Sequence, residues 1–374
     1  MKCATSSLCS RLFAVGGPLL SAICFAAPAP TFSVQVLTNF SGGTDAYVSG
    51  INSVGEAVGS VGSGSAVCPN ECAVTWRDGT PSLLATVEGA FATEAYGVND
   101  AGQVVGNIYM TNYDQSMAAM WNNGTLTLLP APDSQYTSTG TASINDAGQV
   151  AGNASDASGS DSVPIVWNGL IPTVLGGVPA CTGGGYASGI NRNGLIVGTL
   201  FCDHGLAPEP VVWKGIVATL LPIKPTAGAP SGDAYAVNDL GLIVGFSNDA
   251  ANPDLAPSEA TAWANGVATN LGPFPTKEGE STANAVNKQG IIVGKSNWFN
   301  NTFDHAALWS RIDAAPQDLN SLISTQVAAE ITLTEAMGIN DRCTIVANGY
   351  NKKTGAKEAF LLALTDPSSC VNGL

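Results

Sequence analysis

The stretch Ala-Tyr-Gly-Val-Asn-Asp-Ala-Gly-Gln-Val-Val-Gly, residues 95–106, decides the fold of this chain. An extended run leads to Asn99, and a second apolar run follows Gly102. Asn is favoured at the first position of a type I turn, and glycine supplies the left-handed residue that closes a hairpin with a bulge. The stretch therefore predicts two antiparallel strands joined by a tight turn.

The same phrase recurs seven times, at intervals of about 47 residues, which is a spacing typical of repeat architectures. Its asparagines are Asn52, Asn99, Asn145, Asn191, Asn238, Asn287 and Asn340. A second phrase follows each first one and ends in a tryptophan in six copies, Trp76, Trp121, Trp167, Trp213, Trp263 and Trp309, with Leu362 in the seventh. Asn-Gly or Asp-Gly follows several of these tryptophans, which indicates another hairpin.

Each repeat thus predicts a four-stranded sheet, and such sheets repeated every 40 to 50 residues or so are typical of propeller blades. We predict an all-β, seven-bladed β-propeller as a single domain over residues 32–366, with a tail at 367–374. A β-solenoid is the main alternative, but its coils are usually shorter. The seventh copy lacks a fourth strand, so we expect the orphan strand that starts at Phe32 to close the last blade. The tryptophans are expected to pack between sheets rather than to stack on sugars.

The first 26 residues predict a secretory signal peptide, with Lys2 and Arg11 beside an apolar run and cleavage after Ala26 or Ala29. No later segment is apolar enough to span a bilayer. The formal net charge of −15 excludes nucleic acid as a natural partner, because such a surface repels phosphates. We therefore expect an extracellular or periplasmic protein.

The cysteines that remain after cleavage agree with export. They are even in number, Cys68, Cys72, Cys181, Cys202, Cys343 and Cys370. In an exported chain this favours disulfides over metal or redox chemistry. Six cysteines allow 15 pairings, of which we expect three on position. One bond joins Cys68 to Cys72 within a loop, one joins Cys181 to Cys202 across a hairpin, and one joins Cys343 to Cys370 at the tail.

Several of these phrases resemble a known family. The stretch 95–106, the run His-Ala-Ala-Leu-Trp at 305–309, and the segments 318–323 and 333–341 are similar to the HAF repeat of probable extracellular bacterial proteins. The resemblance covers nearly all of the mature chain, although no copy keeps the name-giving tripeptide whole. It implies export, a bacterial source and a repeat architecture. It implies no established catalytic residues.

On function, we expect a secreted or envelope-associated module that binds an unidentified protein or glycan on a propeller face, without catalysis. The chain has only two histidines, His204 and His305, and no recognisable nucleophile motif, so we predict that it is not an enzyme and needs no cofactor. The alternative is a glycan-active enzyme or a sugar-binding lectin that uses the central channel. Carboxylates in loops would serve the acid–base roles.

One set of residues suggests a site. Glu94, Asp233 and Glu335 stand five residues before the repeat Asn, at the start of the innermost strands, and Asp45 and Glu280 fall within two places of that position. These carboxylates would form a negative rim around one channel mouth and attract a cation or a basic partner. Calcium would be the natural metal, because it takes carboxylate oxygens in flexible geometry. The alternative is that they are solvated loop residues.

Overall fold

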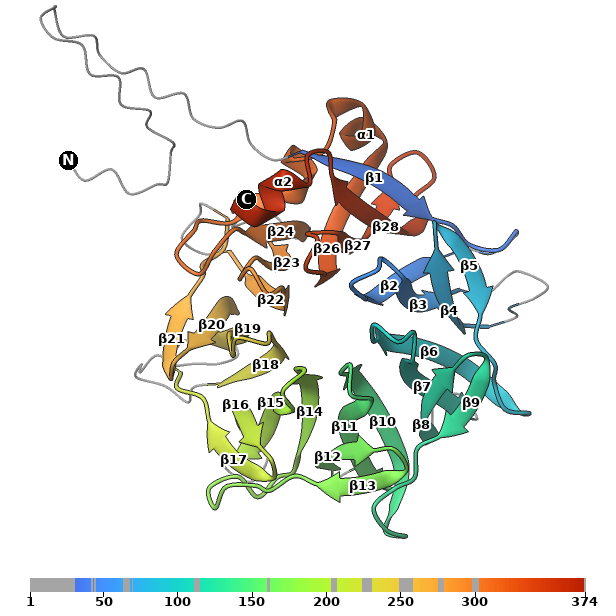
Figure 1. The fold of residues 1–374 in the computed structure, drawn as a ribbon, viewed down its shortest axis with the longest axis vertical. Helices are drawn as coiled ribbons and strands as arrows, with labels where there is room; N and C mark the ends of the chain where they lie inside the picture. The colour runs from blue at the N-terminus through green and yellow to red at the C-terminus, as the bar shows by residue number, and fades with distance from the viewer. Residues whose placement is uncertain are drawn as a thin grey trace, which may run out of the picture.

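The computed structural model describes residues 31–41, 43, 45–62, 68, 70–110, 115–159, 162–202, 207–223, 231–248, 258–274, 279–297 and 303–372. The predicted signal peptide and His204 lie outside this part of the chain. Seven antiparallel sheets of four strands each are arranged in a ring (Figure 1), which confirms the predicted β-propeller. We number the sheets as blades 1 to 7 in chain order.

In blades 1 to 6 the strands follow one another in chain order from the centre of the ring to its outside. Blade 1 contains β2 (Ala46–Ile51), β3 (Ala57–Val61), β4 (Cys72–Arg77) and β5 (Thr80–Leu83). Blade 2 contains β6 (Ala90–Val98), β7 (Val104–Met110), β8 (Gln115–Asn122) and β9 (Thr125–Leu128). Blade 3 contains β10 (Tyr136–Ile144), β11 (Gln149–Asp156), β12 (Ser162–Asn168) and β13 (Ile171–Val174). Blade 4 contains β14 (Gly185–Ile190), β15 (Leu195–Cys202), β16 (Ala207–Lys214) and β17 (Val217–Leu220). Blade 5 contains β18 (Ser231–Val237), β19 (Ile243–Asn248), β20 (Glu259–Ala264) and β21 (Val267–Asn270). Blade 6 contains β22 (Ser281–Val286), β23 (Ile292–Ser296), β24 (His305–Trp309) and β25 (Gln317–Asp318).

Blade 7 joins the two ends of the chain. It contains β26 (Ile331–Ile339), β27 (Ile345–Asn351), β28 (Lys357–Leu364) and, as its outer strand, β1 (Phe32–Leu37). Phe32 pairs with Leu364 and Leu37 with Ala359, so the N-terminal strand closes the last blade as predicted. The segment between β25 and β26 holds the short helices η3 (Leu319–Ser321) and α1 (Thr325–Glu330).

The repeated tryptophans hold neighbouring blades together. All six are at most 1% exposed, which confirms that they pack between sheets. Each indole N–H also donates to a backbone carbonyl just after the outer strand of the preceding blade, for example from Trp213 to Gly176 at 2.7 Å. Because a buried Trp→Ala change typically costs about 3–5 kcal/mol, this repeated contact is a main source of blade cohesion. Leu362, 0% exposed, takes the same register position in blade 7.

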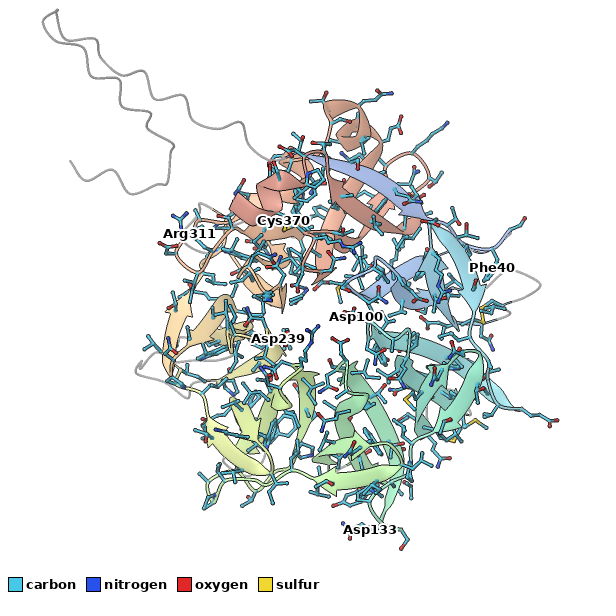
Figure 2. All side chains as sticks on the ribbon, in the orientation of Figure 1. Phe40, Asp100, Asp133, Asp239, Arg311 and Cys370 are labelled. Carbon is cyan, nitrogen blue, oxygen red and sulfur yellow. A yellow bond between two sulfur atoms is a disulfide. The ribbon has the colours of Figure 1, made fainter. Side chains whose placement is uncertain are left out.

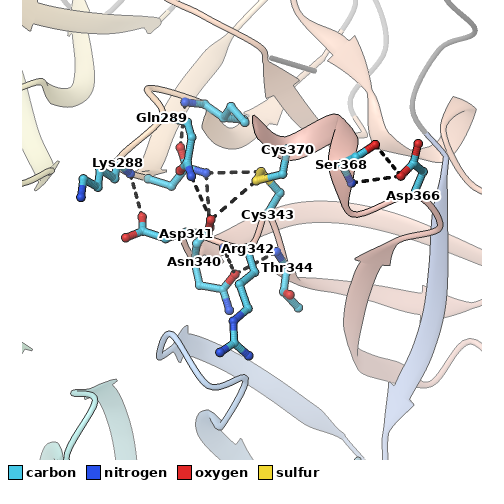
Figure 3. Close-up of a disulfide and its surroundings, with 12 residues drawn as sticks. Lys288, Gln289, Asn340, Asp341, Arg342, Cys343, Thr344, Asp366, Ser368 and Cys370 are labelled. Atoms are coloured by element: carbon cyan, nitrogen blue, oxygen red, sulfur yellow. Dashed lines mark hydrogen bonds between the residues drawn. A yellow bond between two sulfur atoms is a disulfide. The ribbon is translucent and has the colours of Figure 1, made fainter. Parts of the chain in front are cut away.

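The three predicted disulfides are present. Bonds join Cys68 to Cys72, Cys181 to Cys202, and Cys343 to Cys370. The third bond ties helix α2 (Ser368–Asn372) to the hairpin between β26 and β27 (Figure 3). Disulfides are typical of compartments outside the reducing cytoplasm. In the described part of the chain, no helix is long and apolar enough to cross a membrane.

Candidate functional site

The seven repeat asparagines form a closed ring of hydrogen bonds around the propeller axis. The Nδ2 of each one donates to the backbone carbonyl of the Asn in the next blade, from Asn52 to Asn99 at 3.1 Å and so on around the ring. Asn340 closes the circle by donating to the carbonyl of Asn52 at 3.0 Å. The side-chain oxygen meanwhile accepts backbone N–H groups of its own turn, such as that of Gln103 on Asn99 at 2.9 Å. All seven residues are at most 6% exposed.

This ring of hydrogen bonds explains why the first turn position is Asn in all seven repeats, which the turn alone does not require. A type I turn accepts Asp or Ser at its first position as readily as Asn. An Asp carboxylate cannot donate, and a Ser hydroxyl has a single oxygen for both roles, whereas a carboxamide accepts at Oδ1 within its own turn and donates from Nδ2 to the next blade. The occurrence of Asn in all seven copies, although the glycine gives way to Cys343 in one, was the available signal. Cys343 adopts the same left-handed backbone, with φ +57°.

The ring surrounds one mouth of the channel, which we call the ring mouth. It is a cavity of about 240 Å³ lined by three consecutive residues from every blade: an Ile or Val, the repeat Asn, and the residue that follows. The residues that follow are Ser53, Asp100, Asp146, Arg192, Asp239, Lys288 and Asp341. The ring mouth therefore has a charged rim, with four carboxylates against two cations.

The rim carboxylates are held in a fixed orientation by the backbone of the preceding blade. Oδ1 of Asp100 accepts the N–H of Ser53 at 2.9 Å, and Oδ1 of Asp146 accepts the N–H of Asp100 at 2.9 Å. The same contact joins Asp239 to Arg192 at 3.0 Å and Asp341 to Lys288 at 2.9 Å. One oxygen of each carboxylate is thus used for blade contacts. The other oxygen remains for interactions at the opening.

Arg192 reaches across this opening. Its Nη2 lies 2.7 Å from Oδ2 of Asp146 and 3.9 Å from Oδ2 of Asp100, and its Nε lies 3.9 Å from Oδ2 of Asp239. Figure 2 shows Asp100 and Asp239 on facing sides of the central opening. The hydrogen bond and the charge of Asp146, with the charges of the other two carboxylates, raise the pKa of Arg192. One side chain of blade 4 therefore contacts blades 2, 3 and 5.

The sequence-predicted acids lie toward the other end of the inner strands, five residues before the Asn ring. Their side chains have separate partners. Glu94 accepts hydrogen bonds from the hydroxyls of Tyr96 and Tyr109, which also contact each other at 2.7 Å. Burial, assisted by the charge of nearby Glu71, raises the pKa of Glu94 despite these hydrogen bonds.

Asp233 and Glu335 also have partners of their own, and Glu335 accepts a hydrogen bond from Nδ2 of Asn284 at 2.9 Å. Asp233 accepts hydrogen bonds from Thr199 at 2.6 Å and Tyr186 at 3.1 Å, and burial raises its pKa. Burial above all, then the charges of Asp233 and Glu335, raise the pKa of Tyr235. Within the described residues no three His, Cys, Asp or Glu side chains are grouped so that they could hold a metal ion. A calcium site at these acids therefore stays a prediction.

Of the two histidines, His305 has a structural contact. Its Nδ1 lies 2.9 Å from Oδ2 of Asp318 on the neighbouring strand. Asp318 also accepts from the backbone and side chain of Asn320, which begins the segment between blades 6 and 7. Burial alone would raise the pKa of Asp318, but the hydrogen bonds from His305 and Asn320 outweigh it and lower the pKa.

The fold and the ring mouth define a seven-bladed β-propeller with a charged opening. No family model matches the chain, and no curated protein matches it. Similar solved structures include a prolyl endopeptidase, with 10% identity, a TM-score of 0.54 and 89% of this chain covered; the chain spans about half (52%) of that protein. The β-propeller domain of the trilobed protease from Pyrococcus furiosus has 11% identity and a TM-score of 0.53, over 86% of this chain and 98% of that domain. A gluconolactonase from Xanthomonas campestris has 10% identity and a TM-score of 0.40, over 91% and 93%.

These similarities correct one prediction. We expected from the missing nucleophile motif that the chain is not an enzyme, and that prediction is contradicted, because similar propellers occur in enzymes such as the two proteases. The lack of a familiar motif does not decide the matter, since a propeller can bring together reactive groups from blades that are far apart in sequence. The trilobed protease domain has an open Velcro topology, whereas β1 closes the ring here.

Proposed function

We propose that this protein is an exported binding propeller that recognises a cationic group of a ligand at the ring mouth. Export through the signal peptide and membership of the HAF-repeat family are part of this proposal, and the three disulfides support the first. The observation that carries the proposal is the set of four rim carboxylates, each held by a backbone N–H.

The electrostatics of the ring mouth favour a cation. Four carboxylates and two cations leave an excess of negative charge at the opening. A low-dielectric wall focuses the field of such charges into the opening. The net charge of −15 on the whole chain adds to the attraction at long range.

The arrangement also keeps the cost of ordering low. A flexible carboxylate loses side-chain freedom when it binds a ligand, which weakens affinity. Here the Oδ1 contacts, between 2.9 and 3.0 Å, hold the rim carboxylates in place before any ligand arrives. The ring mouth is therefore preorganised for charge-assisted hydrogen bonds to an ammonium or guanidinium group.

The test is calorimetry with short peptides that contain lysine or arginine, at low and high salt. Asn is isosteric with Asp and keeps the Oδ1 acceptor, so Asp239→Asn with Asp341→Asn removes only charge. We expect binding at least tenfold weaker in this double variant than in the native protein. Asp133→Asn, at an exposed site in the loop between β9 and β10, is the control. Equal binding by all three proteins would exclude the ring mouth as the site.

A second candidate function is acid–base catalysis on a glycan by Glu94. Burial raises the pKa of this half-buried carboxyl, and two tyrosine hydroxyls contact it, so its protonated form is favoured over that of an exposed glutamate and can serve as a proton donor. A panel of glycans with native protein, Glu94→Gln and the exposed control Glu88→Gln tests it. Activity lost only in Glu94→Gln supports this function, and activity that is equal in all three removes it.

A further inference from the structure

Arg192 departs from the repeat at the ring mouth. The residue after the repeat Asn is Asp in four blades, and it is Arg in blade 4. Its guanidinium lies within 3.9 Å of one carboxylate oxygen from each of three other blades. These are the Oδ2 atoms of Asp100, Asp146 and Asp239, the oxygens that the backbone contacts leave available.

The interaction of the Arg192 guanidinium with the rim carboxylates is of the kind that we propose for the cationic group of a ligand. The Asp146 contact is a charge-assisted pair of two hydrogen bonds, at 2.7 Å from Nη2 and 3.1 Å from Nε. The other two carboxylates lie farther off, at 3.9 Å, so the guanidinium is held closely on one side only.

The hold on Arg192 is also weak. Its side chain is 59% exposed, and those of the three carboxylates are between 31% and 37% exposed. Exposed ion pairs are screened by water and salt and contribute little to stability. An arginine side chain has several rotatable bonds, so it can swing into solvent without any change in the backbone. The carboxylates stay in place when it does, because their Oδ1 contacts do not involve the guanidinium.

We infer that Arg192 occupies, in the free protein, the place of an arginine or lysine side chain of a partner polypeptide, which displaces it on binding. This inference rests on the proposed function and gives the ligand of that same site. In the closed form Arg192 offsets part of the negative charge of the rim. In the open form the three Oδ2 atoms receive the partner's cation.

The competition has a measurable consequence. The apparent affinity for the partner's cation equals the intrinsic affinity multiplied by the fraction of molecules in the open form. Removal of Arg192 therefore restores the intrinsic affinity. The probe is the peptide N-acetyl-Gly-Arg-Gly-amide, and its control carries citrulline, which has the same shape without the charge. We expect Arg192→Ala to bind the arginine peptide about three- to fivefold more tightly than the native protein, because an exposed ion pair favours the closed form only modestly, and neither protein to bind the citrulline peptide. Adding Asp146→Asn to Arg192→Ala should remove the gain.

Two further variants separate the explanations. Arg192→Gln keeps the stem and loses the charge, so it should bind like Arg192→Ala if competition is the cause; Arg192→Lys should stay close to the native protein. Circular dichroism checks that each variant is folded. Equal binding of the arginine peptide by the native protein and Arg192→Ala would overturn the displacement inference and leave the proposed function standing. Absence of binding by every variant would overturn both.

Discussion

Replacing one asparagine of the ring tests how much the ring stabilises the propeller. Asn238 is a suitable choice because its side chain is 6% exposed and makes three clear contacts. Its Nδ2 donates to the carbonyl of Asn287 in the next blade at 2.9 Å. Its Oδ1 accepts the N–H groups of Leu240 at 3.0 Å and Leu242 at 2.9 Å.

The magnitude follows from these contacts. A buried hydrogen bond contributes about 1 kcal/mol net, so Asn238→Ala should lower the free energy of unfolding by about 3 kcal/mol. Asn238→Asp isolates the contact between blades, because it keeps the two accepted bonds and loses the donated one. It also brings a carboxylate beside the carbonyl of Asn287, so a cost of about 1–3 kcal/mol is expected.

Urea unfolding followed by tryptophan fluorescence measures both variants, since the six buried tryptophans lie between blades. Asn122→Ala, at the exposed end of β8, is the matched control and should change the free energy by less than about 0.5 kcal/mol. If Asn238→Ala shifts the unfolding midpoint no more than the control does, the ring of asparagines is a by-product of the turns and the reasoning is refuted.

Three further outcomes are expected. Replacing Cys343 and Cys370 by Ser opens a bond of sequence separation 27 and should cost about 3.5 kcal/mol by the loop-entropy relation, measured by urea unfolding; no change would show that the tail is held by other contacts. Asp318 has a lowered pKa in the folded protein, so its charge stabilises the fold at neutral pH. The free-energy difference between native protein and Asp318→Asn should therefore vanish in acid, as the pH falls through the folded pKa. Asp233 has a raised pKa, so native protein loses stability relative to Asp233→Asn as the pH rises through that pKa; melting curves from pH 3 or so to neutral that run parallel would contradict this.

Much of the fold could be predicted from the sequence because the turns of each repeat are encoded by residues that are close together in the chain. The Asn and Gly of 99–102 define a hairpin without any knowledge of the other blades, and the tryptophans mark the next one. Closure by β1 followed from counting strands. The pairing of Cys181 with Cys202 followed from their nearly equal distances from one turn. These are all short-range inferences within one sheet.

The ring mouth was not accessible in the same way. The residue after the repeat Asn varies among Ser, Asp, Arg and Lys, so it resembles an ordinary turn position. Its meaning depends on contacts between blades, such as that of Arg192 with Asp146, which are 46 residues apart. The acids at Glu94, Asp233 and Glu335 were found because they share a strand position, but the sequence could not reveal that each has its own hydrogen-bond partners.

The seam between blades 7 and 1 decides whether the ring mouth exists at all. Three kinds of contact cross or support it: the pairing of β1 with β28, the hydrogen bond from Asn340 to Asn52, and the side chain of Asn348, which bonds both backbone groups of Val48 at 2.9 and 3.1 Å. The bond between Cys343 and Cys370 secures the same blade. The chain joins blade 7 to blade 1 through the residues between β1 and β2, as it joins every other neighbouring pair, but blade 7 alone is completed by pairing the two ends of the chain, β1 with β28. The rim carboxylates form one site only while the ring is closed, because each is oriented by the blade before it. The stability of the seam and the geometry of the ring mouth are therefore one property of the molecule.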